Sequence, residues 1–413
     1  MDNEYIVSLG QAAKTASAEI SRASTAQKNS ALDAIARLLV ERSDEITTAN
    51  KLDLEYAAAK GIPAPMLDRL KLDDKRIAGI ADSLSELIKL ADPVGSGSRT
   101  TRPNGLVIEN IRVPLGVVAI IYEARPNVTV DAAALCVKTG NACILRGGSE
   151  AINTNRALTQ LMRDALCEVG LPADSVALVN DTTRESATAL MKLRGYIDLL
   201  VPRGGAGLIR SVVENAEVPV IETGAGNCHV YIDESADLDM AVKVTLNAKL
   251  SRPSVCNAAE TLLVHKNIAA QFLPAFKSAL THELVIRGCE RTREIIDCEA
   301  ADESDWATEY DDYILAVRVV DSLDEAIAHI SRYSTKHSEA IITRSMESAS
   351  RFQSEIDAAA VYVNASTRFT DGGEFGFGAE LGISTQKLHA RGPMGLDALT
   401  TNKYLVTGNG QIR

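Results

Sequence analysis

The strongest constraint on the fold is a run of six apolar residues, Val117–Tyr122, which opens a long alternation of apolar runs and helix-like segments. A run without polar alternation is typical of a strand in a parallel sheet that is covered on both faces. The further runs are Ala142–Leu145, Val176–Val179, Ile197–Val201 and Val218–Ile221, and the helix-like segments are Val130–Lys138, Asn153–Val169 and Arg184–Leu193. This rhythm predicts a parallel sheet with helices on both faces.

A second series of the same kind follows Gly226. Its expected strands are His229–Ile232, Thr261–Val264, Ile314–Val320, Glu339–Ile342 and Val361–Asn364, and its expected helices include Leu238–Lys249 and Leu323–Ser331. The first hundred residues indicate helices, with one apolar stripe across Ser30–Ile46. Leu106–Arg112 alternates like a strand, and Tyr404–Val406 is a candidate edge strand. We therefore expect an α/β fold with two parallel-sheet domains.

The composition argues against several classes of protein. The formal net charge of −12 disfavours nucleic-acid binding, which needs a basic face. The seven cysteines are odd in number and include no CxxC pair, so we expect reduced thiols in a cytoplasm instead of disulfides or a zinc site. The six histidines show no metal-ligand spacing, and no run of about 18 apolar residues predicts a membrane span. We expect no metal, no nucleic acid and no membrane partner.

Cys256 is the candidate nucleophile. It lies among polar and basic residues in Ser251–Asn257 and is followed by the helix-compatible pair Ala258–Ala259. A thiol near a helix N-terminus is a better nucleophile because the thiolate is favoured there. The alternative is an ordinary buried cysteine, which suits cysteines of apolar segments such as Cys136.

Polar residues follow several of the expected strands, where ligands of α/β proteins bind. Glu222 could act as a base, and the amide of Asn127 could donate to an oxyanion. Arg146 could reach a phosphate, and the backbone of Arg203–Gly205 could bind one at the start of a helix. The alternatives are a solvated acid, a turn asparagine, a surface arginine and a tight turn.

Five segments together resemble the glutamate-5-semialdehyde dehydrogenases, a branch of the aldehyde dehydrogenase superfamily also called γ-glutamyl phosphate reductases. The segments are Val113–Ala151, VPRGGAGLI (Val201–Ile209), Ile221–Asp233, Asn247–His265 and Val363–Thr401. The likeness covers nearly the whole chain. It implies an aldehyde dehydrogenase-like fold, with two parallel-sheet α/β domains and a small β arm for oligomerisation.

The resemblance also implies a division of the chain. Residues 1–104 and 119–225, with part of 366–395, would form an NADP-binding domain, and 226–365 would form the catalytic thiol domain. Residues 105–118 and 396–413 would form the oligomerisation arm of a homo-oligomer.

Roles for single residues follow from the same resemblance. Cys256 takes the place of the nucleophile, Asn127 of an oxyanion contact and Glu222 of the family's water-activating glutamate. The implied cofactor-binding residues are Arg146, Gly147, Ser149, Arg203, Gly204, Gly205 and Glu309. Ser149 stands where many relatives carry a glutamate towards the adenosine ribose, which favours NADP over NAD. Arg125 and Arg368 are candidates for the substrate's carboxylate or phosphate.

The implied reaction is reduction of L-glutamyl 5-phosphate by NADPH to L-glutamate 5-semialdehyde and phosphate, through a thioester on Cys256, in proline biosynthesis. Phosphate would cleave the thioester in the reverse direction, so Glu222 has no required hydrolytic role. We expect a separate glutamate 5-kinase to supply the substrate. The alternatives are an aldehyde dehydrogenase that uses water, a thiol acyltransferase or hydrolase, and a non-catalytic α/β scaffold.

Overall fold

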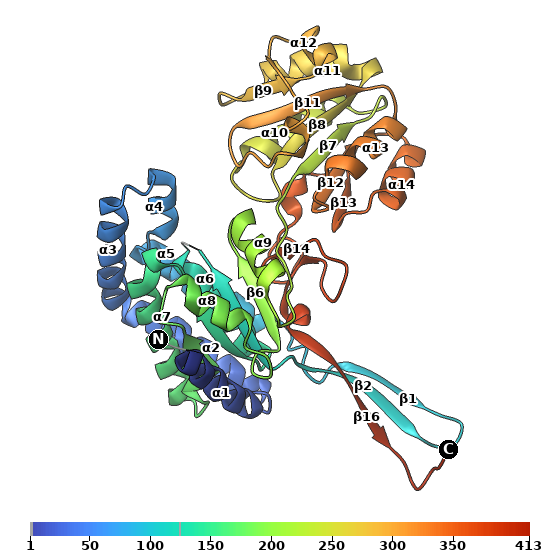
Figure 1. The fold of residues 1–413 in the computed structure, drawn as a ribbon. Helices are drawn as coiled ribbons and strands as arrows, with labels where there is room; N and C mark the ends of the chain where they lie inside the picture. Colours follow the sequence, from blue (N-terminus) through green and yellow to red (C-terminus); the bar gives the residue numbers. More distant parts are fainter. Residues whose placement is uncertain (1–2, 124) are drawn as a thin grey trace. The chain divides into compact units, whose positions relative to one another are not determined.

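The computed structural model describes residues 3–123 and 125–413 (Figure 1). The chain divides into two compact units. The first unit holds residues 1–223, 376–382 and 394–413, and the second holds residues 224–375 and 383–393. No helix among the described residues is both long enough and apolar enough to cross a membrane.

Helices make up the start of the first unit. They are α1 (Asn3–Ile20), α2 (Thr25–Glu41), α3 (Ser43–Ala59), α4 (Ala64–Leu70) and α5 (Asp74–Lys89). A capping box begins α2 at Ser24. The Ser24 hydroxyl accepts the N–H of Gln27, and the side-chain oxygen of Gln27 accepts the N–H of Ser24. The continuous stripe expected across Ser30–Ile46 is wrong at one point: Arg42 leaves helical geometry and separates α2 from α3.

Four parallel strands form the sheet of the first unit, in the order β5-β4-β3-β6. They are β3 (Val117–Tyr122), β4 (Ala142–Arg146), β5 (Val176–Leu178) and β6 (Leu199–Arg203). The four expected strands from Val117 to Val201 are confirmed, but a strand at Val218–Ile221 is wrong, because that segment makes only an isolated bridge to Leu200. Pro219 has no N–H to donate, so a ladder cannot continue through it.

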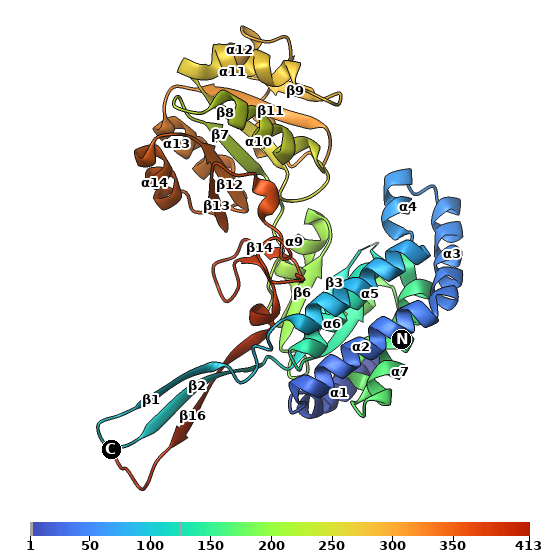
Figure 2. The ribbon, with the colours of Figure 1, turned by 180° about the vertical axis from the view of Figure 1, so that it is seen from behind.

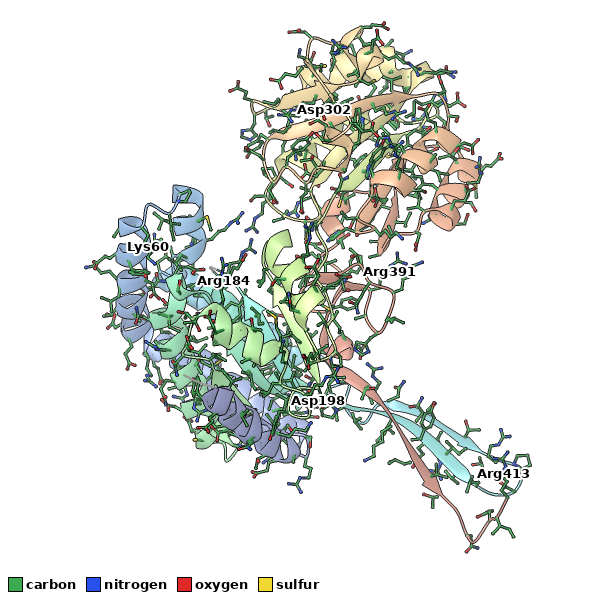
Figure 3. The ribbon with its side chains drawn as sticks, in the orientation of Figure 1. Lys60, Arg184, Asp198, Asp302, Arg391 and Arg413 are labelled. Atoms are coloured by element: carbon green, nitrogen blue, oxygen red, sulfur yellow. The ribbon has the colours of Figure 1, made fainter. Side chains whose placement is uncertain are left out.

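The helices that connect these strands agree with the sequence pattern. They are α6 (Pro126–Lys138), α7 (Ile152–Glu168), α8 (Arg184–Met191) and α9 (Ala206–Asn215). Strand β3 begins at a tight turn in which Gly116 has φ +128° and approaches Asp198 so closely that a Cβ would lie 2.1 Å from its carboxylate. Asp198, labelled in Figure 3, accepts the N–H of Val117 at 2.8 Å and pairs with Lys14 on α1.

An antiparallel three-stranded sheet completes the first unit, in the order β1-β2-β16. Its strands are β1 (Gly97–Thr101), β2 (Val107–Pro114) and β16 (Thr400–Thr407), which lie side by side in Figure 2. The expectation that Tyr404–Val406 lies in an edge strand is confirmed, since β16 pairs only with β2. Strand β1 was not predicted, and its fully exposed residues explain why no apolar pattern marks it.

The second unit contains a seven-stranded parallel sheet, in the order β10-β9-β11-β8-β7-β12-β13. The strands are β7 (Cys228–Ile232), β8 (Ala259–His265), β9 (Val285–Gly288), β10 (Glu299–Ala300), β11 (Ile314–Val320), β12 (Ser338–Ile342) and β13 (Ala360–Val363). All five expected strands of this series are confirmed; β9 and β10 are additional.

Helices cover both faces of this sheet. They are α10 (Leu238–Leu250), α11 (Lys266–Ser278), α12 (Glu290–Arg293), α13 (Leu323–Tyr333) and α14 (Met346–Glu355). Successive side chains of β7 point to opposite faces: Val230 packs with α10 and α11, and Tyr231 packs with α13 and α14. This two-sided core explains the continuous apolar runs of the sequence.

Short elements connect the larger ones. They are the 3₁₀ helices η1 (Ser149–Ala151), η2 (Ala173–Ser175), η3 (Asp305–Ala307), η4 (Thr367–Phe369) and η5 (Leu396–Leu399), and the strands β14 (Ile383–Ser384) and β15 (Gly392–Pro393). Two of them bear on the sites below, since η1 contains Ser149 and η4 contains Arg368.

Candidate active site

The loop 251–258, which we call the thiol loop, carries the half-buried Cys256 between α10 and β8. The expected helix N-terminus at this position is wrong. Helix α10 ends at Leu250, before the thiol, and Ala259 already begins β8, where it pairs with Cys228 of β7. Ala258–Ala259 is compatible with a helix, but pairing with β7 extends the chain there. None of the seven cysteines forms a disulfide in the described structure.

The main chain of the thiol loop is held by close backbone packing. Gly226, just before β7, lies so near Cys256 that a Cβ on it would be 1.5 Å from the Cys256 carbonyl oxygen. The Sγ of Cys228 donates to the same oxygen at 3.2 Å. Burial raises the pKa of the Cys228 thiol, so this sulfur keeps its proton and can donate.

A second segment, on η4, is tied to the residue after the thiol. The buried side chain of Asn257 donates to the carbonyls of Arg368, at 3.2 Å, and Thr370, at 3.0 Å. The main-chain carbonyl oxygen of Asn257 accepts from Thr367 Oγ1 at 2.7 Å. The Arg368 guanidinium contacts the Asn257 side chain and lies 3.1 Å from Ser251 Oγ through Nε. Asn257 therefore fixes the place of Arg368 beside the thiol loop.

The guanidinium of Arg368 interacts electrostatically with Cys256. Burial is the main cause that lowers the pKa of the Arg368 guanidinium; Arg252 also lowers it, and Asp371 and Cys256 act in the opposite direction. A cation thus lies beside the thiol loop, where a helix N-terminus was expected.

Glu309, in the segment before β11, contacts Gly226, the glycine that packs against Cys256. Its carboxylate accepts the N–H of Gly226 at 2.7 Å, and burial raises its pKa. Three predicted site residues therefore lie within the second unit. Arg368 contacts the thiol loop that carries Cys256, and Glu309 contacts Gly226, which packs against Cys256. Gly226 and Asn257, which hold these segments, were not predicted as site residues. The signals in the sequence that could have identified them are a glycine just before a strand and an asparagine directly after the cysteine.

The other predicted residues lie at the carboxyl edge of the first unit's sheet. Strand β4 lies on one side of β3 and β6 on the other, so the strand order reverses between β3 and β6. Ligands of such sheets bind outside the carboxyl ends of the strands at this switch point. Arg125 and Asn127 follow β3, Arg146 ends β4 and is followed by Gly147–Ser149, and Arg203 ends β6 and is followed by Gly204 and Gly205.

The glycine turn at the switch point already holds a carboxylate. Glu123 accepts the N–H of Gly205 at 2.9 Å, at the start of α9, and a Cβ on Gly204 would lie 2.5 Å from the same carboxylate. The turn thus directs an amide at an anion. Glu123 was not predicted, because its role depends on the neighbouring strand.

Two predicted side chains have partners of their own in the first unit. Asn127 donates to Asp131 at 3.0 Å, one turn further along α6. Burial raises the pKa of Asp131 to about 6, although Asn127 and Arg203 both act to lower it. Arg146 donates from Nη2 to the carbonyls of Thr182 and Thr183, at 2.7 and 2.8 Å, and burial lowers its pKa.

The half-buried Glu222 follows the segment that forms only an isolated bridge, not a strand. With Asn127 and Arg125 it belongs to the first unit, whereas Cys256 belongs to the second. Their roles at the thiol therefore stay predictions.

Comparisons with known proteins bear on this geometry. A family model described as the aldehyde dehydrogenase family matches residues 1–294. A γ-glutamyl phosphate reductase of Clostridium perfringens (strain 13 / Type A) is 61% identical over the whole of both chains, and one of Halothermothrix orenii is 57% identical over 99% of each.

Solved structures agree. The crystal structure of γ-glutamyl phosphate reductase from Thermotoga maritima has a TM-score of 0.97 at 51% identity and covers 99% of each chain. An acetylating aldehyde dehydrogenase from Geobacillus thermoglucosidasius, at 16% identity and a TM-score of 0.73 over 100% of this chain and 98% of its own, shares the fold. The chain belongs to the aldehyde dehydrogenase family, in the branch of the γ-glutamyl phosphate reductases.

Proposed function

We propose that the chain reduces L-glutamyl 5-phosphate to L-glutamate 5-semialdehyde with NADPH and releases phosphate, as a step of proline biosynthesis in the cytoplasm. One observation carries the proposal: the thiol loop holds Cys256 beside a guanidinium, in a chain 61% identical to a γ-glutamyl phosphate reductase.

The second unit supplies the acyl chemistry. The Cys256 sulfur attacks the acyl carbon, the bond from that carbon to the phosphate oxygen breaks, and phosphate leaves with the electron pair, so that a thioester remains. The amide of Asn127 is the proposed donor to the oxyanion formed during attack, together with a backbone N–H near the thiol. Arg368 holds a substrate anion, either carboxylate or phosphate, and Arg125 is the candidate for the other.

The first unit fits a dinucleotide. The amide of Gly205 already points to an anion, a Cβ on Gly204 would meet the Glu123 carboxylate, and both glycines lie at the switch point of the sheet. Arg146, Gly147 and Ser149 would hold the adenosine side, and Glu309 the nicotinamide ribose. When bound, the cofactor supplies the hydride that reduces the thioester carbon, after which the aldehyde leaves and the thiol is restored.

NADP is the proposed form of the cofactor because Ser149 lacks the charge that would repel a 2′-phosphate. The neighbouring Glu150 limits this preference, since its carboxylate lies 3.5 Å from Ser149 Oγ. Glu150→Gln should therefore tighten NADP binding without tightening NAD binding, as measured by fluorescence titration of each cofactor. Equal effects on both would remove Ser149 and Glu150 from the specificity.

A reverse assay tests the function. Glutamate semialdehyde, NADP and phosphate are mixed with the protein, and NADPH absorbance is followed for wild type, Cys256→Ala and the control Cys167→Ala, whose sulfur is exposed on α7. We expect phosphate-dependent activity that only Cys256→Ala abolishes. Activity without phosphate would indicate a water-using dehydrogenase with Glu222 as the base, and absence of NADPH binding would indicate a thiol acyltransferase or hydrolase.

Partners are the remaining part of the proposal. Strand β16 exposes 65% of Tyr404 and 57% of Val406, so we propose that the sheet β1-β2-β16 joins copies of the chain into a homo-oligomer. A separate glutamate 5-kinase would supply the unstable acyl phosphate. A pull-down that recovers no kinase would exclude direct transfer of the acyl phosphate between the two enzymes and would leave the proposed chemistry unaffected.

A further inference from the structure

The thiol loop is closed at its base by a buried ion pair. Lys249, the second-last residue of α10, donates to Oε2 of Glu260, the second residue of β8, at 2.6 Å. Both side chains are 0% exposed. The end of the helix before the thiol and the start of the strand after it are therefore joined directly, across the loop that carries Cys256.

The same pair holds a second loop. Oε1 of Glu260 accepts the N–H of Asp311 at 3.4 Å, and Asp311 has the left-handed backbone angle φ 56°. The Lys249 ammonium lies 6.0 Å from the centre of the Tyr310 ring. Both contacts fall within two residues of Glu309, so the pair fixes the segment that carries this carboxylate.

The contacts form a closed chain. Glu309 accepts the N–H of Gly226 at 2.7 Å, and Gly226 packs against the carbonyl of Cys256. From there the thiol loop leads back to Glu260. The positions of the nucleophile and of Glu309 therefore depend on one another through the buried pair.

Stability gives a weak reason for such a pair. Removing two charges from water costs more than burying an apolar pair of similar volume. Burial is the main cause that raises the pKa of Glu260, to about 8, and lowers that of Lys249. Since desolvation of the two charges opposes folding, and the pair joins the two loops of the candidate site, the pair is better explained by a role in positioning these loops.

We propose that Lys249 and Glu260 are positioning residues that set Cys256 relative to Glu309. The proposal rests on the function proposed for Cys256. Neither residue takes part in bond making; they act through the two loops. A displacement of about 1 Å at a reacting group can lower the rate about 10²-fold.

The test is the double variant Lys249→Met with Glu260→Met, which removes both charges at similar volume. The matched control is Lys89→Met with Glu86→Met, which removes an exposed ion pair on α5 in which Lys89 Nζ lies 2.7 Å from Glu86 Oε1. Three quantities are measured: kcat and KM in the reverse assay, the rate at which iodoacetamide alkylates Cys256, followed by mass spectrometry, and the melting temperature.

We expect the double variant to lose about 10²-fold in kcat, with KM changed less than about threefold, because binding groups remain and the reacting sulfur moves. Alkylation of Cys256 should change severalfold, and the melting temperature should stay at or above that of wild type. The control should match wild type throughout.

Wild-type kcat and alkylation in the double variant would overturn the proposal. A double variant that no longer folds, or that melts far below wild type, would overturn it too, since the pair would then be a stability element. An inactive wild type would instead reject the function proposed for Cys256, and is distinguished by the first measurement.

Discussion

Gly226→Ala is the change whose effect can be worked out most directly from the structure. The new Cβ would lie 1.5 Å from the carbonyl oxygen of Cys256, 2.3 Å from its carbonyl carbon and 2.6 Å from its Cα. Real Cβ atoms essentially never come within 3.0 Å of such atoms, so one backbone segment must retreat by about 1.5 Å. A flexible side chain could rotate away from the new methyl group, but the contacting atoms of Cys256 belong to the main chain, so the backbone itself must move.

Two consequences follow for the variant. A displacement of this size at the thiol should lower kcat by about 10² to 10³-fold, since about 1 Å already costs about 10²-fold. The strain should also destabilise the protein by about 1–3 kcal/mol, as overpacking does. The reverse assay gives kcat, and thermal unfolding gives the loss of stability.

A matched glycine separates this effect from the cost of any added methyl group. Gly79 is exposed on α5, and a Cβ there would have nothing within 4 Å. Gly79→Ala should keep full activity and gain up to about 1 kcal/mol, because alanine favours a helix more than glycine does. Wild-type kcat in Gly226→Ala would refute the reasoning, since the close packing would then not set the position of Cys256.

Three further predictions concern other contacts. Asn257→Ala should lower kcat and raise KM at least about tenfold in the reverse assay, because it releases the segment of Arg368 through the loss of three side-chain contacts; unchanged kinetics would contradict this. Burial raises the folded-state pKa of Asp131 to about 6, so ionisation of this carboxyl destabilises the wild type as pH rises from about 4 to 7. The melting temperature of Asp131→Asn, measured by calorimetry, should therefore increase relative to that of wild type over this range. A difference between the two that does not depend on pH would count against this prediction. Replacing Tyr404 and Val406 by serine should lower the mass measured by light scattering, and an unchanged mass would exclude β16 from the assembly.

The strands could be predicted from the sequence because burial on two faces leaves a mark on every residue. Val117–Tyr122 and Ile314–Val320 match β3 and β11 end to end. Strand β1 lacks that mark because its residues are exposed. Val218–Ile221 carries the apolar pattern but forms only an isolated bridge, because Pro219 has no N–H for a ladder. Fold class therefore followed from local pattern, and the errors lie where tertiary pairing decides.

The site was only partly predictable, for a related reason. Cys256, Arg368 and Glu309 were identified through family resemblance, yet their neighbours come from distant parts of the chain. Periodicity cannot show that Gly226 meets the carbonyl of Cys256, because only the pairing of β7 with β8 brings the two segments together. The helix expected after the thiol failed in the same way, because β7 extends Ala259 into a strand.

Three contacts of the thiol loop share one property that explains this difficulty. Gly226 packs against the Cys256 carbonyl, Cys228 donates to it, and Thr367 donates to the carbonyl of Asn257. Each of these three contacts acts on the main chain of the loop, in atoms that every residue possesses. In the proposed reaction these restraints would hold the loop while the Cys256 sulfur forms and breaks bonds, since they do not pass through the reacting atom. The identity of Cys256 therefore suggests the proposed chemistry, whereas its position is set by Gly226 and by the polar side chains around the loop.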